Sequence, residues 1–239
     1  MHHVVLERWS RQASVIHRRD PRAKIAALLV FLVVVATAHR GLVMLAPALL
    51  GFLSITVVTA HLPLIKMLLR ASIVLFFTLV FALSSWMAGD PGRALELLLK
   101  SYLSALAVLV VVSTTPMPML LQGLEAAGTP CFLLMVTQFL YRYLFVISEE
   151  AQHMTKAAIS RGAGFRAAAG ALATLFARCY ARAEDIHRAM LARGFAGHFR
   201  TVHTLRFRPN DFAFVLYASL APILMRAAAE ALSQAAGRP

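Results

Sequence analysis

Long stretches without a single charged side chain constrain this sequence more than any other feature. Residues 41–63, 71–89 and 101–123 contain no Asp, Glu, Lys or Arg. The hydrocarbon core of a bilayer is about 30 Å thick and needs roughly 20 apolar residues in a helix, so each stretch is long enough to cross it. Only 15% of the residues are charged, against about 25% in an ordinary soluble domain. The sequence therefore predicts membrane-spanning helices.

Two shorter apolar stretches, residues 25–38 and 212–225, complete the set of predicted spans. They can cross the bilayer if flanking charged residues lie at the interfaces, where long basic side chains extend to water at little cost. We expect this of Lys24 and Arg40 around the first stretch, and of Asp211 and Arg226 around the second. Five such segments leave too little polar chain to cover a soluble core. The predicted fold class is an all-α integral membrane protein with about five transmembrane helices.

The basic residues predict how these helices are oriented. Of 24 Lys and Arg, six precede residue 25, two lie at 66–70, eleven lie at 142–208 and five lie elsewhere. Cytoplasmic loops hold the excess of Lys and Arg, so the first three groups are expected inside. No small-residue cleavage site follows a compact apolar core near the start, so we expect the N-terminal segment to be retained. The predicted order is a cytoplasmic basic segment (1–24), four transmembrane helices (25–114), a cytoplasmic region (115–208), and a last span with the C-terminus (209–239).

The net charge of +13 has a simple explanation in this topology. Basic cytoplasmic loops contact the anionic headgroups of the lipid bilayer. No recognised nucleic-acid-binding module accompanies the charge, so we expect no nucleic-acid partner.

Proline and glycine divide the cytoplasmic region into three predicted helices. Thr114-Thr115-Pro116 closes the fourth span, because the residue before proline is disfavoured in helical conformation. The helices are expected at 117–127, 131–160 and 167–193, and the last two end at glycines. The second is apolar at first and polar later, so we expect it to start at membrane depth and emerge.

The third predicted helix is amphipathic. Apolar residues at steps of three and four form one stripe, which should pack on a neighbouring helix: Leu172, Leu175, Phe176, Cys179, Ala183, Ile186 and Met190. The other side carries Arg178, Arg182, Glu184 and Arg188. The spacing of Glu184 and Arg188 predicts an ion pair within the helix.

Both long helices of this region end in similar phrases, Ser160-Arg161-Gly162 and Ala192-Arg193-Gly194. Helix capping alone could explain either one, because glycine caps helices and a basic residue complements the negative end of the helix dipole. However, each phrase is followed by a further Gly, a Phe and an Arg. The near-duplication suggests two equivalent sites that a partner protein binds.

At these residues the sequence resembles a known family, the transmembrane T component of energy-coupling factor (ECF) transporters. Members carry two Ala-Arg-Gly motifs at the ends of cytoplasmic coupling helices; the second motif is complete here, and the first has Ser160 in place of Ala. Further segments resemble the cobalt/nickel (CbiQ) branch: Asp20-Pro21-Arg22-Ala23-Lys24, Thr114-Thr115-Pro116, Arg182-Ala183-Glu184, and His187-Arg188-Ala189-Met190 leading into the second motif. The resemblance extends from about Arg8 to Ala229.

The resemblance implies a non-catalytic coupling subunit of an importer. Its partners would be two ATP-binding cassette ATPases, which bind the ATP and Mg²⁺, a substrate-binding membrane S component, and in some systems a small accessory membrane subunit. Arg161 and Arg193 would dock into grooves on the ATPases, with Ser160, Gly162, Ala192 and Gly194 shaping the two helix ends. The membrane would be the inner (plasma) membrane of a bacterium or archaeon. Cobalt is the expected cargo, with nickel or a vitamin as alternatives.

Several residue types expected of other functions are missing or scattered. The sequence has no phosphate-binding loop, not even a Gly-Lys pair, so we expect no ATP hydrolysis by this chain. The predicted spans contain almost no ionisable residue apart from His61 near an end, which disfavours an independent carrier. A membrane enzyme stays open as an alternative, and its densest candidate set is Glu149, Glu150 and His153.

No metal site or cofactor is expected in this chain. His2 and His3 could bind a divalent ion but should lie on the cytoplasmic side, away from uptake. His187, His198 and His203 lack the close spacing of metal ligands. Cys131 and Cys179 are isolated thiols on the reducing side, where a disulfide is not expected.

Overall fold

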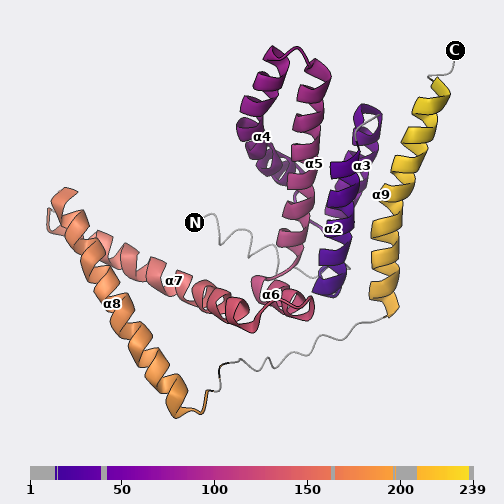
Figure 1. Ribbon diagram of the computed structural model, residues 1–239. Coiled ribbons are helices and arrows are strands. Elements are labelled where there is room, and N and C mark those ends of the chain that lie inside the picture. The colour runs from indigo at the N-terminus through magenta and orange to yellow at the C-terminus, as the bar shows by residue number, and fades with distance from the viewer. Residues whose placement is uncertain are drawn as a thin grey trace. The chain divides into compact units, whose positions relative to one another are not determined.

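The computed structural model describes residues 14, 16–38, 42–162, 165–195, 197 and 209–236. Within these ranges the secondary structure is helical, with no strand. The helices, labelled as in Figure 1, are α2 (Pro21–Thr37), α3 (Leu42–Thr59), α4 (Leu64–Met87), α5 (Pro91–Thr114), α6 (Met117–Ala126), α7 (Cys131–Ser160), α8 (Phe165–Ala192) and α9 (Pro209–Ala236). The all-α prediction is confirmed.

Five of the described helices are long and apolar enough to cross a membrane: α3, α4, α5, α7 and α9. The number of membrane-length helices agrees with the prediction. Two helices differ from it, because α2 is not among the five and α7 is. The expected span at 25–38 belongs to α2, which has 17 residues, and therefore extends only about 25 Å. The α7 helix, expected to start at membrane depth, has 30 residues and an apolar first part long enough for a complete span.

Helix boundaries fall where proline and glycine predicted them. The residue after α5, Thr115, is extended with φ −136° and ψ 119°, and Pro116 follows it. The α4 and α5 helices begin before the uncharged stretches 71–89 and 101–123, because charged residues lie inside their first turns: Lys66, Arg70, Arg93, Glu96 and Lys100. A charged side chain in the first turns of a spanning helix can extend to the interface.

The chain divides into two compact units, which we describe separately. The first comprises Met1–Ala127 and Leu205–Pro239, and therefore holds α2 to α6 and α9. In it α5 packs against α2, α3 and α4, while α9 packs on α2 and α3. Buried apolar side chains from four helices form its core, among them Phe31, Leu49, Met67 and Leu103. Large apolar residues of α4 point outward, such as Phe76, which is 83% exposed. Such a surface suits a lipid environment.

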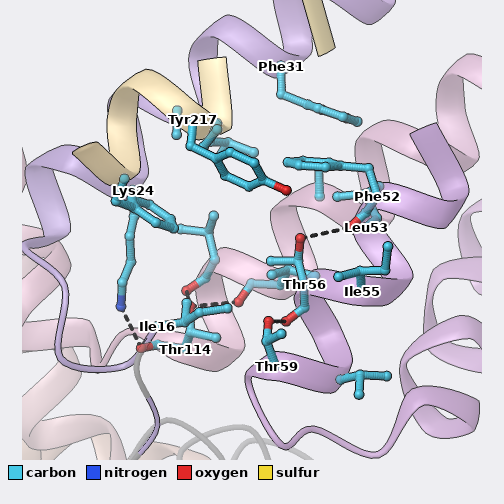
Figure 2. Close-up of a pocket in the computed structure, with 18 of the residues that line it drawn as sticks. Ile16, Lys24, Phe31, Phe52, Leu53, Ile55, Thr56, Thr59, Thr114 and Tyr217 are labelled. Atoms are coloured by element: carbon cyan, nitrogen blue, oxygen red, sulfur yellow. Dashed lines mark hydrogen bonds between the residues drawn. The ribbon is translucent and has the colours of Figure 1, made fainter. Parts of the chain in front are cut away.

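A cavity of about 670 Å³ lies within the first unit, lined by residues of α2, α3, α5 and α9. Figure 2 shows the aromatic rings of Phe31, Phe52 and Tyr217 toward one end. Lys24 and Thr114 lie toward the other end, joined by a hydrogen bond. The other lining residues are mostly apolar, so the charge of Lys24 is unusual in this cavity.

The second unit, Gly128–Thr204, holds α7 and α8, which pack on one another. The predicted stripe of α8 is only partly correct. Leu175, Cys179, Ile186 and Met190 are half-buried, whereas Leu172 and Phe176 are exposed. Arg178, placed by the sequence on the outer side, instead forms an ion pair with Glu150 of α7. The predicted pair of Glu184 and Arg188 is confirmed, at 3.6 Å.

Candidate functional site

The first Arg-Gly ending follows directly on α7, whose last residue is Ser160. The amide of Arg161 donates to the carbonyl oxygen of Ala158 at 3.1 Å, and the amide of Gly162 donates to that of Ile159 at 3.0 Å. Gly162 has φ +70°, a left-handed conformation that favours glycine. The hydroxyl of Ser160 bonds to the carbonyl oxygen of Ala157 at 3.0 Å. Arg161 is exposed at the tip of the helix.

The second ending repeats this geometry after α8, whose last residue is Ala192. The amide of Arg193 donates to the carbonyl oxygen of Met190 at 3.1 Å, and the amide of Gly194 donates to that of Leu191 at 3.0 Å. Gly194 has φ +74°. Arg193 is exposed, as Arg161 is. The two phrases are therefore equivalent in backbone conformation as well as in sequence.

Both glycines are needed for their left-handed backbone conformation, and not because a larger side chain would clash with a neighbour. A Cβ built on Gly162 or Gly194 would meet no atom within 4 Å. A left-handed residue reverses the chain at the helix end, so the arginine before it becomes the last side chain of the tip. Each tip therefore presents a guanidinium on a defined backbone.

An exposed apolar residue accompanies each arginine, two positions before it. Ile159 is 71% exposed and Leu191 is 56% exposed. The sequence places both residues two positions before an arginine, but they were not predicted as part of the site. A guanidinium beside an exposed aliphatic side chain resembles the centre of a protein-binding surface, where arginine and apolar contacts combine.

The α8 helix sets the separation of the two tips. Arg161 and Gly162 precede its first residue, Phe165, and Arg193 follows its last residue, Ala192. With 28 residues and a rise of 1.5 Å per residue, the helix is about 42 Å long. The two arginines thus lie near opposite ends of one helix.

Between α7 and α8 lies a cleft of about 490 Å³ whose lining includes Glu150, Arg178, Cys179 and Asp185. Of the three candidates of the enzyme hypothesis, Glu149, Glu150 and His153, the lining includes Glu150 alone. Glu150, however, is engaged by Arg178, and Glu149 pairs with His153 across 3.9 Å on the exposed surface of α7. Within the described ranges no three His, Cys, Asp or Glu side chains gather as metal ligands would. His2, His3, His198 and His203 lie outside these ranges.

Three distant segments meet at the first turn of α2. Lys24 is 3% exposed, and its ammonium donates to the carbonyl oxygen of Thr114 at 2.9 Å and to the hydroxyl of Thr115 at 3.0 Å. The amide of Asp20 donates to Asp211 Oδ1 at 3.4 Å. The expectation that Lys24 and Asp211 lie at lipid interfaces is wrong, since both are buried in the protein. Arg40 lies outside the described ranges.

Comparison with known proteins agrees with the architecture. Residues 12–204 match the family described as CbiQ, cobalt transport protein. An energy-coupling factor transporter transmembrane protein EcfT from Acidaminococcus fermentans is 29% identical over 81% of this chain and 84% of its own length. The EcfT protein of Bacillus selenitireducens is 26% identical over the same shares.

A further relative carries the cobalt description. The cobalt transport protein CbiQ of Rhodobacter capsulatus is 29% identical over 53% of this chain and 53% of its own length. The family match covers well over half of the chain and includes both Arg-Gly endings. The chain therefore belongs to the CbiQ family of transmembrane T components of energy-coupling factor transporters.

Proposed function

We propose that this chain is the coupling subunit of an ATP-driven importer for a transition-metal ion, with cobalt as cargo. The observation that carries the proposal is the repeated tip: two exposed arginines, each before a left-handed glycine, at opposite ends of α8. Two equivalent tips suit two copies of one partner. In this proposal the copies are cytosolic ATP-binding cassette ATPases, and α7 and α8 transmit their movement to the membrane helices and the S component.

Arginine suits the proposed contact. Its guanidinium is planar and permanently charged, so it can form two parallel hydrogen bonds with a carboxylate. Around each guanidinium, the exposed Ile159 or Leu191 would exclude water from the contact and strengthen it. The ATPases would supply nucleotide and Mg²⁺ sites, and this chain would remain non-catalytic.

The positive charge of the second unit supports its placement on the cytoplasmic side, with the N-terminus on the same side. In this orientation both tips are available to cytosolic ATPases. The cobalt assignment has separate support from the description of the family and from the name of the Rhodobacter relative. Nickel is the alternative cargo, because the two ions are similar and the T component need not bind either.

Copurification and uptake test the proposal. Affinity purification of this chain from its own host should recover two ATPase copies and a small membrane subunit. Vesicles containing that complex should take up Co²⁺ when ATP is supplied on the ATPase side, and should take up less Ni²⁺. Preferential Ni²⁺ uptake would change the cargo but keep the coupling role. Purification of the chain without any ATPase, or metal uptake by the chain alone, would contradict the proposal.

A further inference from the structure

The buried contact of Lys24 has no role in the function proposed so far. Its ammonium has three donors, and three oxygen atoms surround it: the carbonyl of Thr114 at 2.9 Å, the hydroxyl of Thr115 at 3.0 Å and the carbonyl of His17 at 3.5 Å. Thr114 is the last residue of α5 and Thr115 is its cap. One side chain from the first turn of α2 therefore holds the end of α5.

This arrangement differs from an ordinary interfacial lysine. A lysine near a helix end extends to water when it can, because burying an ammonium costs free energy. Here the side chain is buried with two acidic residues, Asp20 and Asp211, which are 6% and 4% exposed. Arg19 lies 3.8 Å from Asp211 as well. A buried polar network of this kind can fix one geometry among several, as single buried polar residues do in coiled coils.

The geometry that Lys24 fixes is the start of α6. Pro116 and α6 follow Thr115 directly in the chain. Further along, α6 approaches α2 closely: a Cβ on Gly123 would lie 3.0 Å from Ile25 Cδ1 and 3.4 Å from Pro21 Cβ. Gly123 and Leu121 are both buried. Thus α6 is held on α2 at two places, by Lys24 just before its start and by the contact at Gly123.

The position of α6 in the chain gives this contact its importance. It is the last helix of the first unit before the second unit begins at Gly128. The backbone joins the two units at two places, between α6 and α7 and between α8 and α9. Movement of α7 that passes along the first connection reaches α2 and α5 through α6. If α6 could separate from α2, part of that movement would be lost in the separation.

We propose that Lys24 is a positioning residue for coupling, which keeps α6 on α2 so that α2, α5 and α6 move together. The proposal rests on the coupling function proposed above. It concerns a residue remote from the two arginine tips and within the first unit. Its effect should therefore appear in the metal transported per ATP hydrolysed, with ATPase binding unchanged.

The test uses the whole complex in vesicles, with Cys131 and Cys179 replaced by alanine. Lys24→Met keeps the length of the side chain but removes its donors, and Lys24→Arg keeps the charge and the donors. We expect Lys24→Met to assemble with both ATPases and hydrolyse ATP, while the metal transported per ATP falls by roughly fivefold or more. Lys24→Arg should recover a large part of the loss.

A disulfide gives the decisive control. The Cβ positions of Pro21 and Gly123 are 3.4 Å apart, close to the range of about 3.5 to 4.5 Å found in disulfides. The pair Pro21→Cys and Gly123→Cys should therefore crosslink α2 to α6 on oxidation. In the Lys24→Met background we expect the oxidised pair to restore coupling, and a reductant to abolish it again. A loss of coupling with another cause than the separation of α6 from α2 would persist after oxidation.

The outcomes separate the two proposals. If the unmodified complex does not couple ATP to uptake, the function proposed above fails. If it does, but Lys24→Met transports the same amount of metal per ATP or stays uncoupled when crosslinked, only the role of Lys24 is overturned. Should Lys24→Met yield no complex, Gly123→Leu replaces it, because the larger side chain pushes α6 from α2. We then expect the same fall in the metal transported per ATP. An unchanged amount of metal per ATP in Gly123→Leu would overturn the inference.

Discussion

The guanidinium of Arg226 in α9 donates a hydrogen bond across 3.2 Å to the carbonyl oxygen of Thr37, the last residue of α2. The same guanidinium also contacts the Thr37 hydroxyl and, through Nε, Glu230 at 2.8 Å. Lys100 of α5 donates to the neighbouring carbonyl of Ala36 at 3.2 Å. From the sequence, Arg226 is expected to extend to the membrane interface; in the structure it also caps α2. The last carbonyls of a helix need such partners, above all where water is scarce.

Replacing Arg226 should therefore destabilise the first unit. We expect Arg226→Met to lower the free energy of unfolding by about 1 to 3 kcal/mol, because it leaves the Thr37 carbonyl without a charged donor. Unfolding of the purified chain in mixed detergent micelles measures the change. Glu230→Gln is the matched control, since it weakens the pair within α9 but keeps the cap. Equal effects of the two substitutions would contradict a capping role.

The helix ends were predictable because their causes are local. Pro116 and Pro130 restrict the residues before them, and Gly162 and Gly194 adopt left-handed conformations at the two tips. The repeated arginines could be recognised for the same reason. Their separation follows from the helix predicted at 167–193, which is confirmed by α8.

The buried polar contacts could not be predicted, because they depend on which helices become neighbours. Lys24, Asp211 and Arg226 all precede or follow apolar segments, and from the sequence they are indistinguishable from interfacial residues. The ion pair of Arg178 with α7 could not be predicted for a similar reason. Its partner Glu150 lies 28 residues away on α7, beyond the reach of helical periodicity.

The two tip glycines allow a test of their backbone role. We expect Gly162→Ala and Gly194→Ala to destabilise the second unit by about 1 to 2 kcal/mol each, because a left-handed conformation strains any residue with a Cβ. Gly170→Ala is the control within α8, where a Cβ also meets nothing within 4 Å and φ is not positive. It should stabilise the helix by about 0.5 to 1 kcal/mol. Thermal unfolding measures all three, and a loss of stability for Gly170→Ala would refute the argument.

The ion pair between α7 and α8 should contribute little stability on its own. Arg178 and Glu150 are 62% and 39% exposed, and exposed pairs usually contribute less than about 1 kcal/mol. A double-mutant cycle with Arg178→Met and Glu150→Gln measures the interaction. The exchanged pair, Arg178→Glu with Glu150→Arg, should restore most of what Arg178→Glu alone loses. A coupling energy well above this range would show that the pair is more than a surface contact.

The two cysteines test the orientation. Cys131 is exposed at the start of α7, and Cys179 is half-buried on α8. If α8 is cytoplasmic, a membrane-impermeant maleimide added to intact cells should not label Cys179, whereas it should label Cys131 if α7 spans the bilayer from its first residue. The same reagent should label Cys179 in inside-out vesicles, and Cys179→Ala identifies that signal. Labelling of Cys179 from outside the cell would reverse the proposed topology.

Charge reversal at the two tips is the most direct test of coupling. We expect Arg161→Glu and Arg193→Glu each to weaken ATPase binding by about 2 to 5 kcal/mol, since the acceptor groups on the ATPase would face a like charge. The membrane unit should still fold, because both side chains are exposed and belong to the other unit. Binding of purified ATPase to the reconstituted chain measures the loss.

Lys156→Glu is the control for charge. It makes the same change on the exposed surface of α7, about one turn before the tip. A general electrostatic attraction between a basic unit and acidic ATPases would weaken equally in all three variants, whereas specific docking should leave Lys156→Glu near the unmodified affinity. Because two ATPases would each use one tip, either single reversal should leave one of them bound, and only the double variant should lose both. Uptake by the double variant at the unmodified rate would exclude a coupling role for the arginines.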